Sequence, residues 1–340
     1  MMSKAVNMTV PQVRVSGAGA EVINQRLLSW ERIDAAGMET DQLRLTLDTT
    51  GQTGLPQEGA TLTWFEGYQG SLKQKGQFII TRITPRLFPP TMTIVATATP
   101  FQTEDNTGLK QRNSRSFENM SLADIFMTLI RLHGFTPKVT SQFEKIQIAH
   151  ADQVNETDLG FLSRLAKEYD AVAKPVDDMY VLASAGQSHT VTGKTIAPVV
   201  LSVPSHNRPS NAGQFINCQL DKPSRGKVTG VKALWTEEES GLEHEVNVGN
   251  APFKGLPQNY LSHETAMQAC QDHLQKVQRE GMSVQVSVPG DPHLVAEGLL
   301  ELDESFPPEM RGIWSIDKVT AKGDCQSGYR CALVATLPAQ

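Results

Sequence analysis

The two ends of this 340-residue chain carry similar sequences, and this internal repeat limits the possible folds more than any other feature. The segment 76–86, GQFIITRITPR, aligns without a gap with 312–322, GIWSIDKVTAK, and seven of the eleven positions are identical or chemically similar. The sequence IVAT at 94–97 then corresponds to LVAT at 333–336. We therefore predict that 76–97 and 312–336 superpose as two copies of one β-hairpin.

Two further blocks keep the same order upstream of each hairpin. The alternating leucines of 43–47 match the alternating valines of 284–288, and the Leu–Gly spacing of 55–59 matches that of 294–298. One alternative stays open, because any two antiparallel hairpins share alternating apolar residues and a leading glycine. The order of four separate blocks favours duplication of one module. Three such chains would supply six similar modules to a ring.

These patterns predict an α+β chain that is mainly β, with three domains. Alternating β-branched residues and frequent glycines over 1–104 predict a first β-barrel or sandwich domain. Residues 105–215 are expected to form a middle α+β domain, entered through the polar segment 101–120, which we interpret as a linker or exposed loop. Residues 216–340 are expected to form a second, similar β-barrel with an inserted helix at about 262–281.

Helix signals are strongest in the middle of the chain. Ser121 with Asp124 three residues later is a capping signature, and the apolar stripe that follows ends at Gly134. A second helix is predicted over 157–169, and a strand over 179–182.

Composition excludes several classes of protein. The net charge of −6 argues against a nucleic-acid binder, and no secretory signal or apolar run of 18 residues is present, so we expect neither classical secretion nor a membrane span. The four cysteines, at 218, 270, 325 and 331, are too sparse for a disulfide scaffold, so reduced thiols are expected. Cys325 and Cys331 flank a predicted hairpin turn, and whether they pair stays open.

No complete motif of catalysis or cofactor binding is present, and we name no catalytic, cofactor-binding or metal-binding residue. Gly193-Lys194-Thr195 ends like a phosphate-binding loop but lacks the earlier glycine at the required spacing. The eight histidines show no i, i+4 pairing of the kind a helical zinc site uses. The acidic runs 237–239 and 301–304 are typical of solvated loops, although Glu301 and Asp303 leave a glycosidase-like carboxylate pair as an alternative. The four tryptophans, at 30, 64, 235 and 314, lie mostly in apolar-patterned strands, which disfavours a carbohydrate-binding platform.

Several segments together resemble the phage late control D protein family. They are Ser-Leu-Ala-Asp-Ile-Phe at 121–126, His133-Gly134, the block NETDLGFLSRLAKEY at 155–169, which is the most specific, and the strand from Met179 to Ala185. The resemblance spans nearly the whole chain and extends to the hub portion of type VI secretion spike proteins. The chain has no β-helical spike of its own, so we expect the spike to be a separate polypeptide.

The resemblance implies a structural, non-enzymatic baseplate hub of a contractile phage tail or tail-like particle. Such a hub is a homotrimer whose two tube-like β-barrel domains per subunit form a pseudo-sixfold ring between the tail tube and the threefold central spike. The implied partners are further copies of the chain, the spike, the tube and other baseplate proteins. The implied location is the virion tail baseplate, assembled in the host cytoplasm, with no cofactor, no membrane binding and no sequence-specific nucleic acid, although DNA can pass through the lumen of the ring. The alternative function is a tail-associated cell-wall hydrolase.

Overall fold

The computed structural model describes residues 10–37, 40–52, 54–98, 108–109, 111–176, 179–184, 197–211, 213–222, 229–237, 240–324 and 328–338. The fold is mainly β, as the sequence predicts, with four α-helices and a 3-10 turn among the described residues.

A first β-rich module is formed by the N-terminal strands and one short helix. Its elements are β1 (Pro11–Gly17), α1 (Ala20–Arg26), β2 (Leu27–Ala35), β3 (Gln42–Asp48), β4 (Thr61–Tyr68), β5 (Ser71–Arg86) and β6 (Thr91–Ala98). Neighbouring strands are antiparallel and follow the order β1-β4-β5-β6-β3-β2.

A second β-rich module is formed mostly by the C-terminal strands. Its elements are β12 (Val199–Leu201), β13 (Asn217–Asp221), β17 (Ser283–Pro289), β18 (Leu299–Leu302), β19 (Gly312–Asp324) and β20 (Gly328–Thr336). They follow the order β12-β18-β19-β20-β17-β13, which repeats the order of the first module strand for strand. One difference is that β12 runs parallel to β18, whereas β1 runs antiparallel to β4.

The two modules also match in register. Each long hairpin carries one β-bulge, between Ile80 and Arg82 in the first module and between Ile316 and Lys318 in the second. These are aligned positions of the sequence repeat. The next strand keeps the register, since Leu45 of β3 pairs with Ile94 and Val286 of β17 pairs with Leu333. The predicted equivalence of 76–97 with 312–336 is therefore confirmed at the level of strand pairing.

The fourth block of the repeat is wrong by one residue. The Gly59 N–H donates to the Ile80 carbonyl at 2.9 Å, and the equivalent donor to Ile316 is Glu297, at 2.7 Å, not Gly298. Both Gly59 and Glu297 have positive φ, 79° and 62°. The backbone conformation is repeated here, whereas the glycine that usually supplies it is not.

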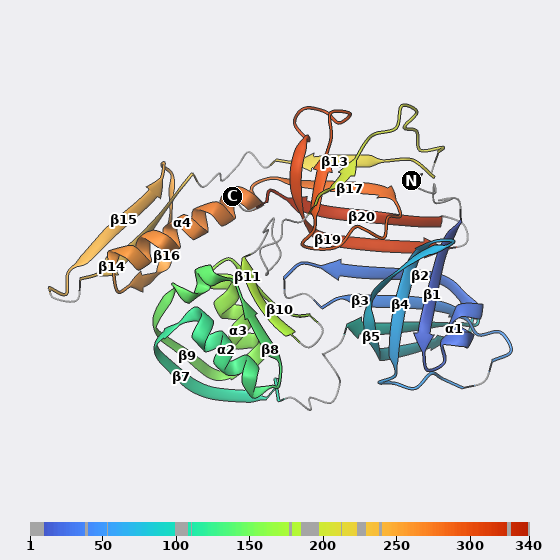
Figure 1. The fold of residues 1–340 in the computed structure, drawn as a ribbon, viewed down its shortest axis with the longest axis horizontal. Coiled ribbons are helices and arrows are strands. Elements are labelled where there is room, and N and C mark those ends of the chain that lie inside the picture. Colours follow the sequence, from blue (N-terminus) through green and yellow to red (C-terminus); the bar gives the residue numbers. More distant parts are fainter. Residues whose placement is uncertain are drawn as a thin grey trace, which may run out of the picture.

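β2 and β19 pair with each other, so both modules belong to one twelve-stranded sheet with one shared core (Figure 1). Figure 1 shows β13, β17, β20, β19, β2 and β3 stacked in that order, with β4 and β1 crossing β2 and β3. The core side chains alternate along each strand, as a half-buried pleated sheet requires. They include Leu43, Leu45, Trp64 and Phe78 from the first module and Val284, Val286, Trp314 and Ile316 from the second.

The middle of the chain has its own core, between two helices and two small sheets. Its elements are β7 (Arg112–Ser121), α2 (Leu122–Leu132), β8 (Thr136–Val139), the 3-10 turn Ser141–Glu144, β9 (Gln147–Thr157), α3 (Asp158–Glu168), β10 (Ala171–Val176) and β11 (Met179–Ser184). The predicted helices are confirmed: the Asp124 N–H donates to the Ser121 hydroxyl at 3.0 Å, and the Gly160 N–H donates to the Thr157 hydroxyl at 3.0 Å.

The interpretation of 101–120 as a linker or loop is wrong for its second half. Arg112–Ser121 is strand β7, which pairs with β9 in a two-stranded ribbon. Most β7 side chains are exposed or half-buried, so the strand needs few apolar residues and its sequence reads as polar. The segment 101–107 lies outside the described residues.

The insertion in the second module is larger than the predicted helix. Between β13 and β17 lie β14 (Gly230–Thr236), β15 (Glu243–Gly249), β16 (Phe253–Tyr260) and α4 (His263–Glu280). α4 is the helix predicted at about 262–281, and Ser262 caps its N-terminus. Ala266, Cys270 and Leu274 of α4 pack on Val231, Ala233 and Val246 of this small sheet. No described helix is long and apolar enough to span a bilayer.

Candidate functional site

The feature of this fold that bears on assembly is the joint between the two β-rich modules. By the joint we mean the antiparallel pairing of β2 with β19, from Ala35 opposite Lys318 to Ser29 opposite Asp324, with the side chains that cross it. Trp30 lies against the backbone of Gly323, because a Cβ there would be 2.7 Å from the indole nitrogen. The joint therefore allows little change at these positions.

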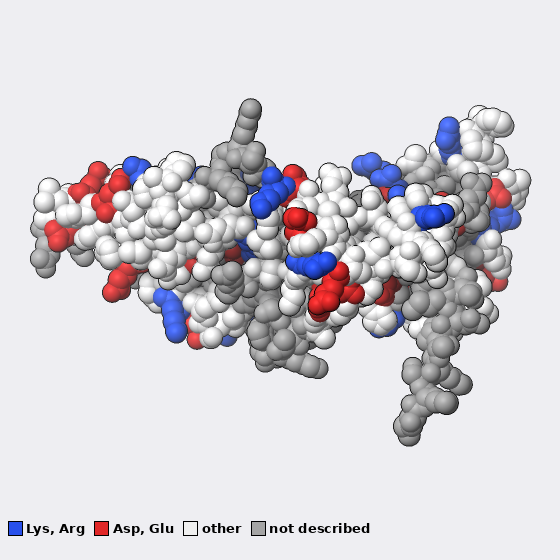
Figure 2. Space-filling model, turned by 90° about the horizontal axis from the view of Figure 1, so that it is seen from above, with Lys and Arg blue, Asp and Glu red and all other residues white. Residues whose placement is uncertain are grey.

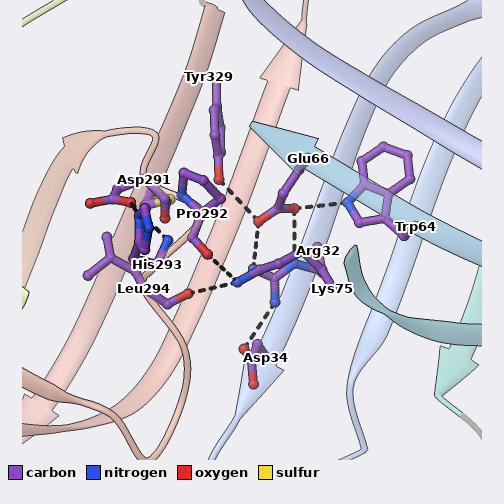
Figure 3. Close-up of polar contacts among 11 residues, drawn as sticks. Arg32, Asp34, Trp64, Glu66, Lys75, Asp291, Pro292, His293, Leu294 and Tyr329 are labelled. Carbon is purple, nitrogen blue, oxygen red and sulfur yellow. Dashed lines mark hydrogen bonds and ion pairs between the residues drawn. The ribbon is translucent and has the colours of Figure 1, made fainter. Parts of the chain in front are cut away.

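A buried ion pair lies at the centre of the joint (Figure 3). The Arg32 guanidinium donates to both carboxylate oxygens of Glu66, from Nη2 at 2.7 Å and from Nε at 3.0 Å. The Glu66 side chain is 0% exposed and that of Arg32 is 2% exposed. Asp34, on the same strand as Arg32, accepts a further bond from Nη1 at 3.1 Å. Both partners come from the first module.

The Glu66 carboxylate accepts hydrogen bonds from further donors. Trp64 Nε1 donates at 2.8 Å, and the hydroxyl of Tyr329, from the second module, donates at 3.1 Å. Lys75 donates to the carbonyls of Pro292 and Leu294, at 2.8 and 3.2 Å, and so also joins the modules. The carboxylate thus accepts four hydrogen bonds, which compensates much of the cost of burying it.

The electrostatics of this cluster favour the charged pair. Burial alone would raise the pKa of the Glu66 carboxyl, but the charge and hydrogen bonds of Arg32 lower that pKa below its usual value. Burial alone would lower the pKa of Arg32, and the Glu66 carboxylate raises it instead. Burial, together with repulsion from Arg32, lowers the pKa of Lys75. The cluster holds fixed charges that bind each other.

Aromatic rings surround the ion pair and exclude water from it. Trp30 lies 5.1 Å from Trp64 and 5.3 Å from Tyr329 between ring centroids, and Tyr68 lies 5.9 Å from Tyr329. The Tyr68 hydroxyl donates to the Gly290 carbonyl of the second module at 2.7 Å. Three of the four tryptophans are buried in this shared core, as the strand pattern predicts, and Trp235 is half-buried in the insertion.

A second buried carboxylate stabilises the middle of the chain. Asp158, the first residue of α3, has no exposed side-chain surface and contacts Arg115 at 2.8 Å, His133 at 2.7 Å and Gln153 at 2.6 Å. Burial would raise its pKa, but the bonds from Gln153, Arg115 and His133 lower it. These contacts fix α3 and the end of α2 to the β7–β9 ribbon, which is a structural role.

An ion pair joins the insertion to the middle of the chain. Arg279 of α4 donates to Asp170, just after α3, at 2.6 Å, with both side chains mostly buried. The insertion therefore contacts the segment 111–184 through this ion pair.

The residues that the sequence analysis considered as candidates for catalysis or metal binding do not form a reactive centre in the described structure. Asp303 accepts bonds from Ser202 and Ser305 in an exposed turn, and these bonds lower its pKa, whereas a general acid needs a raised one. A pocket at one end of the joint is lined by Ala35, Ala36, Gly37, Val172, Asp317, Lys318 and Val334, and neither Glu301 nor Asp303 reaches it. Among the described residues no three His, Cys, Asp or Glu side chains are placed to hold a metal ion. Gly193–Thr195, Glu238, Glu239 and Cys325 lie outside the described residues.

The buried ion pair was not predicted, although the sequence carries a signal for it. Along β4 the core-facing residues alternate as Leu62, Trp64, Glu66 and Tyr68, so a carboxylate occupies a core position. Arg32 occupies the same kind of position two residues after Trp30 in β2. A charged residue in phase with core residues predicts a buried partner of opposite charge.

On the face shown in Figure 2, Lys and Arg side chains are interspersed with Asp and Glu. Among the described residues on this face no continuous basic stripe is visible of the kind that follows a nucleic-acid backbone.

Comparison with known proteins gives consistent matches. The family model described as "Phage tail baseplate hub (GPD)" matches residues 107–327. The "probable baseplate hub protein" of Escherichia phage 186 is 30% identical over 233 residues, and that of Escherichia phage P2 is 32% identical over 215 residues. These matches cover 67% and 63% of this chain but only 57% and 52% of the relatives, so the matched region is little more than half their length.

Solved structures share the fold at low sequence identity. A 43 kDa prophage tail protein from Shewanella oneidensis has a TM-score of 0.64 at 12% identity, covering 97% of this chain and 99% of its own. A tail protein from Neisseria meningitidis has a TM-score of 0.66 at 10% identity, with 96% of each chain covered. A component of the E. coli type VI secretion system has a TM-score of 0.60 at 11% identity, covering 96% of this chain and 77% of its own. The family match over 107–327, together with the relatives from phages 186 and P2, identifies the chain as a member of the phage tail baseplate hub (GPD) family.

Proposed function

We propose that this protein is a structural hub subunit in the baseplate of a contractile phage tail or a related tail-like particle. Family membership supports this role. The site geometry agrees with it, because the side chains of Tyr68, Lys75 and Tyr329 join the two modules through hydrogen bonds in the shared core. Its location is then the tail baseplate of the virion, and assembly takes place in the host cytoplasm.

We further propose that the chain acts as a homotrimer that adapts threefold to sixfold symmetry. The observation that carries this proposal is the repeated strand order of the two modules, with the bulge at the same aligned position in each. Each module acts as one tube-like β-barrel, so three chains place six similar modules around one axis. One face of the ring fits a sixfold tail tube, and the other fits a threefold central spike. DNA passes through the lumen without sequence-specific contacts.

The proposed domain boundaries are the predicted ones, with barrel domains at 1–104 and 216–340 and a middle α+β domain at 105–215. Strand β12 (Val199–Leu201) departs from this division, because it pairs with β18 of the second module. The insertion 230–280 lies away from the shared sheet in Figure 1, which leaves it accessible to other baseplate proteins. The middle domain approaches the end of the joint, where Val172 of β10 lines a pocket together with Ala35 and Lys318.

The hydrolase alternative finds no support in the geometry. A glycosidase needs two carboxylates across a cleft, one with a raised pKa. Glu301 and Asp303 are two residues apart at the end of β18, and the pKa of Asp303 is lowered. Peptidoglycan turnover by purified protein that disappears in the Glu301→Gln or Asp303→Asn variant would establish the alternative.

The trimer is tested by measuring mass in solution, by native mass spectrometry and light scattering, with and without the spike protein. We expect a mass of three chains and a threefold particle in electron micrographs. Monomer alone at high concentration, in the presence of the spike, would refute the symmetry-adaptor role.

A further inference from the structure

The joint inside the chain shows how one module binds the next. One edge of β19 has two partners: the N-terminal half of β19 pairs with β18, and the C-terminal half pairs with β2. Strand order and register make β5 the equivalent of β19, and β13 the equivalent of β2. A second joint of the same kind therefore requires β13 of one chain to pair with β5 of another.

In the part of the chain that the structure describes, neither of the edges needed for this second joint has a partner strand. The N-terminal half of β5 pairs with β4, from Ser71 to Ile79, but no described residue pairs with Arg82–Arg86 on that side. β13 pairs with β17 on one side and with no described strand on the other. Pro85 fits an open edge, because a proline inside a sheet is confined to positions that need no N–H donor.

Equivalent positions of β19 and β5 differ in burial, as expected when β5 lacks a neighbouring strand that β19 has. Ala321 of β19 is 0% exposed, whereas its equivalent Pro85 is exposed. Just beyond β5, Leu87 is 93% exposed and Phe88 is 84% exposed, the two largest values among the exposed large hydrophobic residues of the described chain. Their equivalents, Gly323 and Asp324, lie opposite Trp30 and Ser29 within the joint.

We propose that β13 of one subunit pairs antiparallel with the free edge of β5 in the next subunit. Transfer of the β2–β19 register places Thr84 opposite Asp221, Pro85 opposite Leu220 and Arg86 opposite Gln219. One residue further along, the same register places Leu87 opposite Cys218. The inference rests on the proposed trimer and names the two strand edges that form it.

Side-chain size and charge are complementary in this register. Within the chain, the large Trp30 lies opposite the small Gly323, and across the proposed interface the small Cys218 lies opposite the large Leu87. Asp221, opposite Thr84, has Arg82 and Arg86 as its diagonal neighbours on the same face. Opposite charges at such positions stabilise a sheet, and like charges destabilise it.

The interface uses a different edge on each partner, so it is heterologous and continues from chain to chain until a ring closes. When the ring closes at three chains, joints within chains and proposed interfaces between chains alternate around it. All six modules would then contact their neighbours through one kind of strand pairing.

Disulfide trapping tests this register. Residues opposite each other in antiparallel strands alternate between two kinds of pair, both with Cα separations that a disulfide spans. We therefore use two neighbouring pairs: Arg86→Cys with Gln219→Cys in a Cys218→Ser background, and Leu87→Cys with the native Cys218. β5 and β13 of one chain are separated by six strands of the sheet, so a disulfide within one chain is excluded.

Mild oxidation should convert most of the protein into dimers and then covalently closed trimers, with no larger species, and reductant should return it to monomer. The matched control is Thr84→Cys with the native Cys218, three residues out of register, which should stay monomeric on a non-reducing gel. Leu87→Cys with Cys218→Ser should also lose the cross-link. Strong cross-linking of the Thr84→Cys control would show that the register is wrong.

Light scattering on the same samples separates this inference from the proposed trimer. Trimeric protein in which neither pair cross-links would overturn the proposed edges and leave the symmetry-adaptor role intact. Monomeric protein, as in the test above, would overturn both.

Discussion

Replacing Glu66 with glutamine removes the negative charge from the centre of the joint while keeping the size of the side chain. The carboxylate accepts two bonds from Arg32, one from Trp64 and one from Tyr329, and an amide has one oxygen for these four donors. Removing one partner of a buried pair typically costs about 3–5 kcal/mol. Asp34 still contacts Arg32 at 3.1 Å, so we expect about 3 kcal/mol, the lower end of this range.

The loss can be measured by urea unfolding followed by tryptophan fluorescence, at one fixed protein concentration because oligomers gain stability with concentration. Trp30, Trp64 and Trp314 are all buried in the shared core and report on it. The matched control is Glu245→Gln, whose partner Lys232 is 2.8 Å away with both side chains more than 40% exposed. Because this pair is exposed to solvent, its loss should change stability far less than the loss of the buried pair. A Glu66→Gln effect no larger than that of the control would refute the role assigned to the buried pair.

Three further changes have defined outcomes. The pKa values of Glu66 and Asp158 are lowered in the folded protein, so these carboxylates contribute fully to stability above the usual carboxyl pKa of about 4. Their contribution is lost as the pH falls through the pKa values of the folded state. The Glu66→Gln variant should therefore lose stability less steeply than wild type when unfolding is measured at decreasing pH. Asp158→Asn leaves Arg115 and His133 without a carboxylate and should raise amide hydrogen exchange throughout α3, by a factor that reflects about 2–4 kcal/mol, while exchange in β19 and β20 stays unchanged. Gly290→Ala places a Cβ 2.1 Å from the Tyr329 ring and should cost about 1–3 kcal/mol, whereas Gly255→Ala, with nothing within 4 Å, should be close to neutral in the same unfolding measurement.

Local patterns predicted much of this fold. The three predicted helices were found from their apolar stripes, and the first also from its cap at Ser121, because these signals lie within a few residues of each other. The hairpin repeat was found because a strand with one buried face must alternate, and a shift of one residue would turn every side chain to the wrong face. The bulges at Thr81 and Asp317 kept their places in the alignment for the same reason.

Features that depend on distant residues were not predicted. Tyr329 and Glu66 are 263 positions apart, and nothing local in either strand specifies that they meet. β7 was missed because its two-stranded ribbon buries few side chains. Glu297 was misaligned because its left-handed backbone, which usually indicates glycine, is held here by the surrounding hydrogen bonds. In each case tertiary contacts decide what local propensity leaves open.

The observed β2–β19 pairing and the proposed β5–β13 pairing form under different conditions, and the side chains of β5 favour a ring over other aggregates. The joint inside the chain is tethered and forms on folding, whereas the edges of β5 and β13 stay open until another chain arrives. An open edge can also pair with its own copy, but pairing of β5 with β5 would bring Arg82 and Arg86 of one chain against the same arginines of another. Pro85 removes a donor from such a ladder, while Asp221 of β13 offers these arginines an opposite charge. The β5 edge is therefore protected against its own copy and suited to β13, as a heterologous ring of three chains requires.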